Sequence, residues 1–277
     1  MNAESSTWPV TWVTPCANGA TLWRDMVFGW FSKDKTSNLQ KTIERATNKL
    51  AQQVDRMAAL EKLREEGTAD ALFGLCKRWG VTSSKGVEDE YEKNWVVDVL
   101  AASGKSALPP LARYMKEAIE LSFALRTLQR ITSTTGEAGM VAKSETLNLI
   151  DELFASEPPG YTRHPERRID LIRWLAEWKG VSSDEVVPRL TPYLADFDEN
   201  ARFAAIDGIA HHSPALIAAP LAQALIRPEE ESIRIRRTVA EIIAKQQLPL
   251  GDAATAAAAV LTGQLGHFRI ENGTLRG

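Results

Sequence analysis

The sequence contains few cysteines, no long apolar run and no excess of one charge. Its 277 residues include two cysteines, Cys16 and Cys76, and no Cys-x-x-Cys pair. This rules out a disulfide framework, and we expect the protein in a reducing cytoplasm. No apolar stretch reaches the roughly 18 residues that a membrane helix needs, so no membrane span is expected. The 33 basic and 36 acidic residues give a net charge of −3, which disfavours a nucleic-acid partner held through its phosphates.

The N-terminal segment differs from the rest of the chain. Residues 1–25 are rich in serine, threonine, proline and glycine and have no helical period, so we predict a flexible extension over residues 1–31. No signal peptide is expected, because Glu4 lies where a basic residue is needed. One alternative is that translation starts at Met26. Another is peripheral membrane attachment through the apolar run over residues 26–31, which lysines follow.

From about Asn38 onward, apolar residues recur with the 3.6-residue period of an α-helix. Alternating β-branched runs, which would predict strands, are almost absent. Short breaks with glycine, proline, serine, threonine or aspartate separate the helices, so residues 32–265 are predicted to form a domain of repeated helix pairs. Within it, Thr42–Arg56 is predicted to be one long polar helix, and the polar insertion Thr132–Lys143 a mobile loop. The second helix of each pair is predicted near residues 69–79, 106–117, 144–156, 183–195, 213–226 and 251–264.

Comparison of the sequence with itself reveals an internal repeat. The segment Arg168–Ala176 aligns with Arg202–Ala210 and again with Arg236–Ala244. Arginine recurs at the first position, apolar residues at the fifth and eighth, and alanine at the ninth. Earlier segments match this pattern more loosely. A fixed period of this length indicates stacked supersecondary units rather than a single closed core.

These segments resemble HEAT repeats, most clearly at Asp198–Ile209 with Pro214–Leu225 and at Ile235–Ile243. The resemblance covers about residues 50–264. It implies an all-α fold, a right-handed α–α superhelix (an armadillo-type, HEAT-like solenoid) of about six helix pairs. It also implies a curved scaffold for other proteins, since proteins of this class usually act in that way and only a few are enzymes or chromophore-attachment factors.

A single helix pair cannot bury its apolar faces by itself. In a stack these faces are buried, because each pair covers the apolar face of its neighbour. Leu60, Leu100, Leu175 and Ile209 are predicted to fill the space between the helices. A small residue such as Gly208 would let adjacent units approach closely.

Three short motifs look catalytic or metal-binding, and none is accepted. Gly104–Ser106 is similar to the end of a phosphate loop, but Val99 stands where the first glycine belongs. Ser32–Lys35 fits Ser-x-x-Lys without its companion motifs. His211–His212 completes no metal shell and is interpreted as a helix C-terminal cap. We therefore predict no catalytic, metal or cofactor-binding residue, no cofactor and no enzyme.

The repeated arginines Arg168, Arg202 and Arg236 have two interpretations. They could form a phosphate-binding stripe, or each could tie its repeat to an acidic group in the next repeat, and the structural interpretation is favoured. The candidate acids are Asp170, Asp198 and Glu231.

Trp174 and Trp178 share one helix face. With Asp151 or Asp170 they would be the only plausible carboxylate–aromatic arrangement for gripping an extruded base. Core packing is favoured for both tryptophans, because they occupy periodic apolar positions.

Two regions are predicted to contact a partner. The proline-rich loop Glu157–Pro165 would present Tyr161 and Arg163 outward. The second helices should line the inner curve, and the residues expected on that surface are Arg78, Arg113, Tyr114 and Tyr193.

The C-terminal residues 266–277 contain Asn272-Gly273, a hairpin signal. This tail is predicted either to cap the last repeat as a small hairpin or to fray.

The function expected from the sequence is a non-enzymatic scaffold or adaptor that binds another protein on the concave face. Two alternatives stay open: a HEAT-like lyase or chaperone-like factor for a chromophore or cofactor protein, and a HEAT-like DNA glycosylase.

Overall fold

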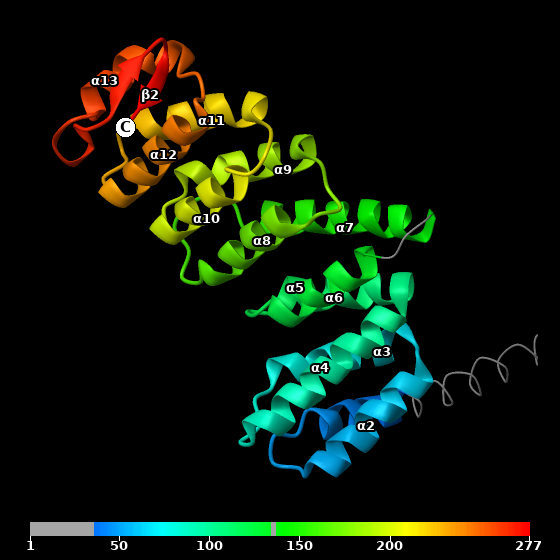
Figure 1. Cartoon of the computed structure of the whole chain (residues 1–277). Coiled ribbons are helices and arrows are strands. Elements are labelled where there is room, and N and C mark those ends of the chain that lie inside the picture. Colours follow the sequence, from blue (N-terminus) through cyan, green and yellow to red (C-terminus); the bar gives the residue numbers. More distant parts are fainter. Residues whose placement is uncertain (1–35, 134–136) are drawn as a thin grey trace, which may run out of the picture.

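A computed structural model describes residues 36–133 and 137–277, and within them the fold is all-α apart from one C-terminal hairpin (Figure 1). This confirms the all-α part of the predicted fold class. The extension over residues 1–31, the possible start at Met26 and Cys16 lie outside the described residues.

A first helix covers residues 36–46. The elements that follow are α2 (Gln53–Glu66), α3 (Ala69–Cys76), η1 (Lys77–Gly80), α4 (Gly86–Ala102), η2 (Gly104–Ala107), α5 (Leu108–Glu117), α6 (Ser122–Thr132), α7 (Glu137–Ser156), α8 (Glu166–Glu177), α9 (Ser183–Leu190), η3 (Thr191–Ala195), α10 (Glu199–Ile209), α11 (Pro214–Ile226), α12 (Ile233–Gln246), η4 (Gly251–Ala253), α13 (Ala254–Val260), η5 (Gly263–Leu265), β1 (Arg269–Glu271) and β2 (Thr274–Arg276).

Each predicted second helix overlaps an observed one, but two predictions are wrong. Thr42–Arg56 is not one helix, because the first helix ends at residue 46 and α2 begins at Gln53. In the break, the Asn48 side chain accepts a hydrogen bond from the Leu50 N–H at 3.0 Å, an asparagine turn that competes with helix. The insertion predicted as a loop is largely helical, since α7 already begins at Glu137.

The helices pack in two layers that follow chain order. One layer holds α2, α4, α6, α8, α10 and α12, in which each helix contacts the next. In the other layer α3 contacts α5, α5 contacts α7, α9 contacts α11, and α11 contacts α13. Figure 1 shows this progression from blue to red along the molecule. No helix among the described residues is long and apolar enough to cross a membrane.

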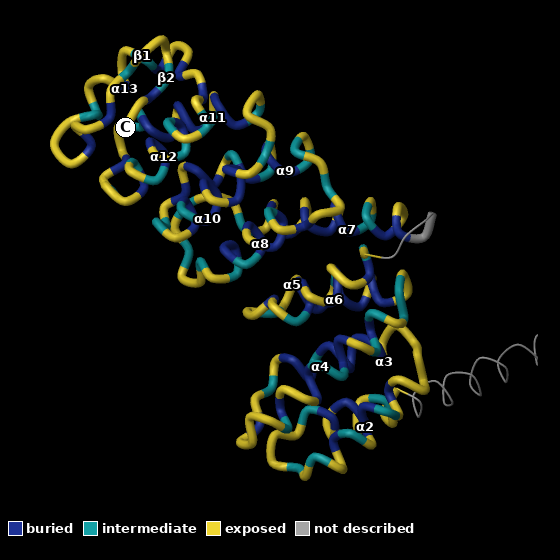
Figure 2. Tube along the Cα trace, in the orientation of Figure 1, coloured by how far each residue is buried: buried dark blue, intermediate teal, exposed yellow. Residues whose placement is uncertain are grey.

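The apolar core is one continuous cluster that runs between the two layers (Figure 2). The four residues predicted to fill it, Leu60, Leu100, Leu175 and Ile209, are all fully buried. A Cβ atom on Gly208 would lie 3.0 Å from the Cβ of Ala176, so this glycine does allow α10 to approach α8 closely.

Cys76 lies at the end of α3 and is fully buried. Its Sγ is 3.3 Å from the carbonyl oxygen of Leu72, and it forms no disulfide within the described residues. Burial raises the pKa of this thiol well above its ordinary value. The side chain therefore behaves as a small apolar group.

The C-terminal hairpin forms and covers the last helices. Asn272 and Gly273 adopt φ values of 52° and 78°, the left-handed pair of a type I′ turn. Across the strands, Ile270 pairs with Leu275, which is fully buried. β2 packs against α12, and the Leu250 N–H donates a 2.8 Å hydrogen bond to the Gly273 carbonyl. Of the two predicted alternatives, the tail is therefore a cap.

Candidate interaction site

Three of the residues predicted to lie on the partner surface are buried, so that placement is wrong for Arg78, Tyr114 and Tyr193. Tyr114 packs edge-on against Trp79, and the Tyr193 hydroxyl donates a 3.0 Å hydrogen bond to the Glu157 carbonyl. Burial raises the pKa of both tyrosines to about 12. Arg78 and Tyr193 lie in the 3₁₀ segments η1 and η3, where three residues per turn shift the face that the α-helical period assigns.

The other three predicted contact residues are exposed, but they do not meet. Arg113 in α5 stacks 3.8 Å above the Phe73 ring. Tyr161 and Arg163 lie in the loop between α7 and α8. Tyr161 contacts Phe197 of the loop between η3 and α10, edge to face with 5.5 Å between ring centroids. Sequence reasoning missed Phe197, which carries no periodic signal.

Two of the repeated arginines tie adjacent units together, as the structural interpretation predicts. Arg168 donates to Asp196 at 2.5 Å, and Arg202 donates to Glu230 at 2.9 Å. The partner acids differ from those predicted. Asp198 instead accepts hydrogen bonds from backbone N–H groups at the start of α10, which makes it the helix cap.

The two tryptophans considered for gripping a base are not exposed to a ligand. Trp174 and Trp178 are buried against each other with 4.8 Å between ring centroids, which confirms the core-packing interpretation. Arg189 donates hydrogen bonds to both carboxylate oxygens of Asp151, at 2.7 and 2.8 Å. Burial raises the pKa of Asp170.

The histidine pair His211–His212, which was considered as a metal site, follows the end of α10. His212 Nδ1 lies 3.2 Å from the Ser183 hydroxyl. No group of three potential ligand side chains comes together in the described part of the chain.

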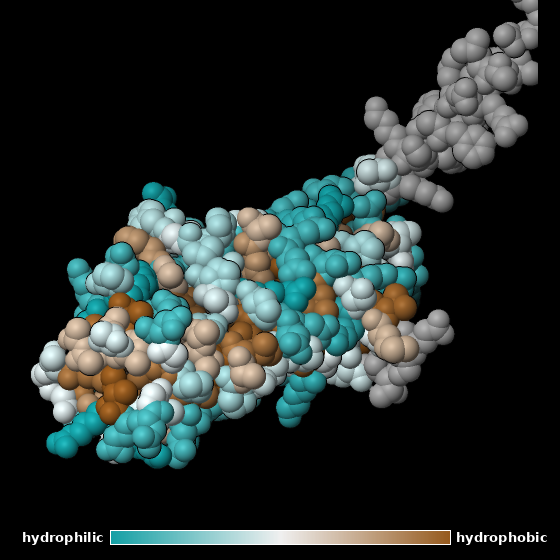
Figure 3. All heavy atoms as spheres, turned by 90° about the horizontal axis from the view of Figure 1, so that it is seen from above, coloured by the Kyte–Doolittle hydropathy of each residue, from teal (hydrophilic) through white to brown (hydrophobic). Residues whose placement is uncertain are grey.

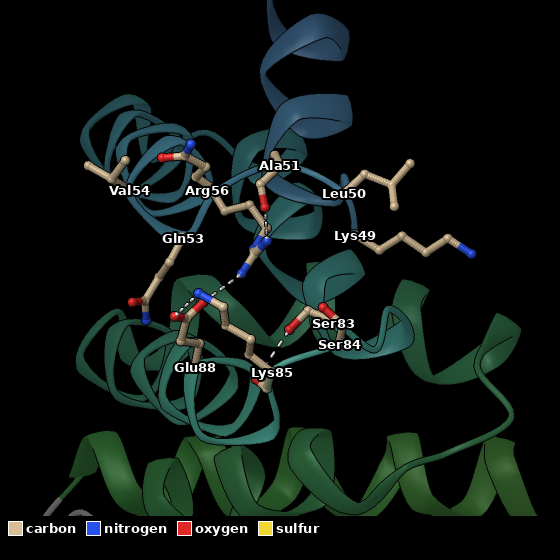
Figure 4. Close-up of a pocket in the computed structure, with 11 residues that line it drawn as sticks. Lys49, Leu50, Ala51, Gln53, Val54, Arg56, Ser83, Ser84, Lys85 and Glu88 are labelled. Carbon is tan, nitrogen blue, oxygen red and sulfur yellow. Dashed lines mark hydrogen bonds and ion pairs between the residues drawn. The ribbon is translucent and has the colours of Figure 1, made fainter.

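A hollow of about 520 Å³ opens where α2 and α4 begin (Figure 4). The chain lines it with two short segments, residues 49–54 and 83–85, together with Arg56 and Glu88. Lys49 and Lys85 are exposed on its rim, and Lys85 pairs with Glu88 at 2.9 Å. The hollow is therefore polar and of mixed charge at its entrance.

A buried network of ion pairs extends inward from Arg56, which lines the hollow. Glu92 accepts hydrogen bonds from Arg56 at 2.7 Å and from Arg78 at 2.7 Å. Arg78 also donates to Asp89 at 2.6 Å, and Lys93 contacts the second Asp89 oxygen at 2.8 Å. The hydrogen bonds to Glu92 raise the pKa of Arg56. Because the network joins α2, η1 and α4, it fixes these elements relative to one another.

The electrostatics of Asp89 lead to a pH prediction. Burial alone would raise the pKa of Asp89, but hydrogen bonds from Lys93, Arg78 and the Ser83 N–H lower it far below its ordinary value. A carboxyl whose pKa is lower in the folded than in the unfolded chain contributes stability above pH of about 4, and this contribution is lost as pH falls.

We therefore expect the melting temperature of the wild-type chain to fall more steeply than that of Asp89→Asn between pH of about 5 and about 3. Thermal unfolding followed by circular dichroism across this pH range tests the prediction. Two parallel curves would contradict it. Asp70→Asn, at a carboxylate that is mostly exposed in its pair with Arg113, is the matched control.

Large apolar side chains surround the hollow. Leu50, Val54, Val87 and Tyr91 are between 57% and 87% exposed. Val54, Val87 and Tyr91 line a second, open hollow together with Met57. We name these five residues the α2–α4 patch. Four of the five line the same hollow, and exposed apolar residues that lie together mark interaction surfaces more often than single ones do.

A second apolar area lies at the opposite end of the molecule. Figure 3 shows apolar residues gathered at the end that holds α11 and α13. Neither helix carries a charged residue, but the exposed positions are mainly alanine, such as Ala219 and Ala258. Alanine offers little area for contact, so the α2–α4 patch is the stronger candidate.

Comparisons of the chain with protein-family models, with curated proteins and with solved structures found no match.

Proposed function

We propose that this protein is a non-enzymatic scaffold, a HEAT-like right-handed superhelix of about six helix pairs that binds another protein. The chain-ordered contacts within each helix layer and the arginine ties between units support this architecture. Of the four residues expected on the concave face, Arg113 alone is exposed. We therefore place the partner contact on the α2–α4 patch instead.

The observation that carries this proposal is the cluster of large exposed apolar side chains beside a polar hollow. Apolar anchors surrounded by polar and charged groups are the usual composition of a protein interface. Lys49, Lys85 and Glu88 supply such a polar border. The buried network below holds α2 and α4 in place, so little ordering is needed when a partner binds.

The glycosylase and chromophore-lyase alternatives gain no supporting arrangement from the described residues. A chaperone-like factor for another protein would still use a protein-binding surface, and it would therefore be affected by the same substitutions.

The double substitution Val54→Asp with Val87→Asp is expected to lower partner binding about tenfold or more, because two apolar side chains that the partner would cover become charged. Affinity capture of the tagged chain from its own cells, with quantitative mass spectrometry, measures the change. Ile119→Asp with Met140→Asp is the control, since both side chains are exposed and apolar but lie on other elements. Undiminished recovery of the same proteins by the patch variant, at an unchanged melting temperature, would refute the proposed surface.

A further inference from the structure

Each arginine of the repeated pair Arg168 and Arg202 has two kinds of hydrogen-bond partner. One is a carbonyl of the loop that precedes its own helix: Gly160 for Arg168 and Phe197 for Arg202, both at 3.0 Å. The other is a carboxylate 28 residues further along the chain, at Asp196 or Glu230. The carboxylate belongs to the loop that precedes the next helix of the same layer.

Arg236 has only the first kind of partner. It occupies the equivalent position in α12, and its Nη2 donates to the Arg227 carbonyl of the preceding loop at 3.2 Å. Within the described residues no carboxylate contacts it. The residue 28 positions further on is Gln264. Its side-chain oxygen accepts a hydrogen bond from the neighbouring Arg237 at 3.0 Å.

The missing carboxylate coincides with the end of the layer. No helix follows α12 in its layer, and β2 of the hairpin packs against α12 instead. The hairpin adds positive charge, because Arg269 stands directly opposite Arg276. In the described part of the chain none of Arg236, Arg237, Arg269 and Arg276 forms an ion pair. Like charges placed opposite each other are unfavourable, and an anion would neutralise them.

We propose that Arg236 is a carboxylate-binding position, and that the C-terminal end of the array binds an acidic segment of a partner protein. The carboxylate of that segment takes the place that Asp196 and Glu230 take in the preceding units. Guanidinium–carboxylate hydrogen bonds are charge-assisted and directional, so they select an acidic side chain over a neutral amide of the same shape. This site is separate from the α2–α4 patch and does not depend on it.

The test uses a fluorescein-labelled hexaglutamate peptide, with hexaglutamine as the neutral control. Fluorescence anisotropy is measured for the wild-type chain, Arg236→Gln and Lys245→Gln at about 0.15 M salt. Lys245 is exposed on the same helix, so its substitution removes the same charge. We expect the wild type to bind hexaglutamate and not hexaglutamine. Arg236→Gln should weaken binding about tenfold or more, and Lys245→Gln less than about twofold. Equal weakening by both substitutions, or no binding by the wild type up to about 1 mM, overturns the proposal.

Circular dichroism of Arg236→Gln and Lys245→Gln confirms that each variant is folded, so a change in hexaglutamate binding reports the loss of the side chain and not of the fold.

Discussion

Replacing Glu92 with alanine is expected to lower the free energy of unfolding by about 3–5 kcal/mol, because it leaves two buried guanidinium groups without their shared carboxylate. Glu92 is fully buried and accepts hydrogen bonds from Arg56 and Arg78, whose side chains are 3% and 0% exposed. Neither arginine can reach water without moving α2 or η1. Urea unfolding at neutral pH, followed by circular dichroism, measures the change.

The matched control for this prediction is Glu145→Ala. Glu145 pairs with Lys105 at 2.8 Å, but both side chains are largely exposed. An exposed ion pair contributes about 1 kcal/mol or less, so the same substitution should cost little there. If Glu92→Ala costs no more than Glu145→Ala, the network is not the stabilising element described above.

Leu175→Ala is expected to destabilise the protein by about 2–5 kcal/mol, since it leaves a cavity in the closely packed core. Leu175 lies in α8 and is fully buried. In a stack where each unit contacts only its neighbours, the loss of stability should be largest in the helices near the cavity. Amide hydrogen exchange should therefore accelerate in α8 and α10 before it changes in α2 and α3.

Leu50→Ala is the control for the core substitution. It makes the same chemical change at a side chain that is 87% exposed, so its effect on unfolding should stay within about 0.5 kcal/mol. Equal costs at the two leucines would contradict the assigned core. Uniform acceleration of exchange along the whole chain would contradict local coupling between stacked units.

The sequence predicted most of the helices and their order, because a similar pattern of apolar residues recurs along the chain. The arginine at the start of Arg168–Ala176, Arg202–Ala210 and Arg236–Ala244 marks equivalent positions in three successive units. The helix predictions were wrong where local residues override the 3.6-residue period of the apolar positions. Asn48 ends the first helix by bonding to the local backbone, and α7 continues into a stretch whose small polar residues indicated a loop.

The candidate site was much less predictable. Arg56 and Glu92 are 36 positions apart, and nothing in their local sequence indicates that two charged side chains are buried together. Val54 and Val87 count as ordinary helical apolar residues until the structure leaves them uncovered. Arg78 and Tyr193 were misplaced because a 3₁₀ turn changes the phase of the helix.

Because Cys76 is fully buried at the end of α3, the reactivity of its thiol reports how often this part of the chain opens. An alkylating reagent can reach its sulfur only when α3 separates from its neighbours, so the labelling rate follows how often that helix pair opens. With Cys16 replaced by serine, each modified molecule would record one such opening. Disturbances near the amino-terminal units could then be distinguished from those that begin at the hairpin.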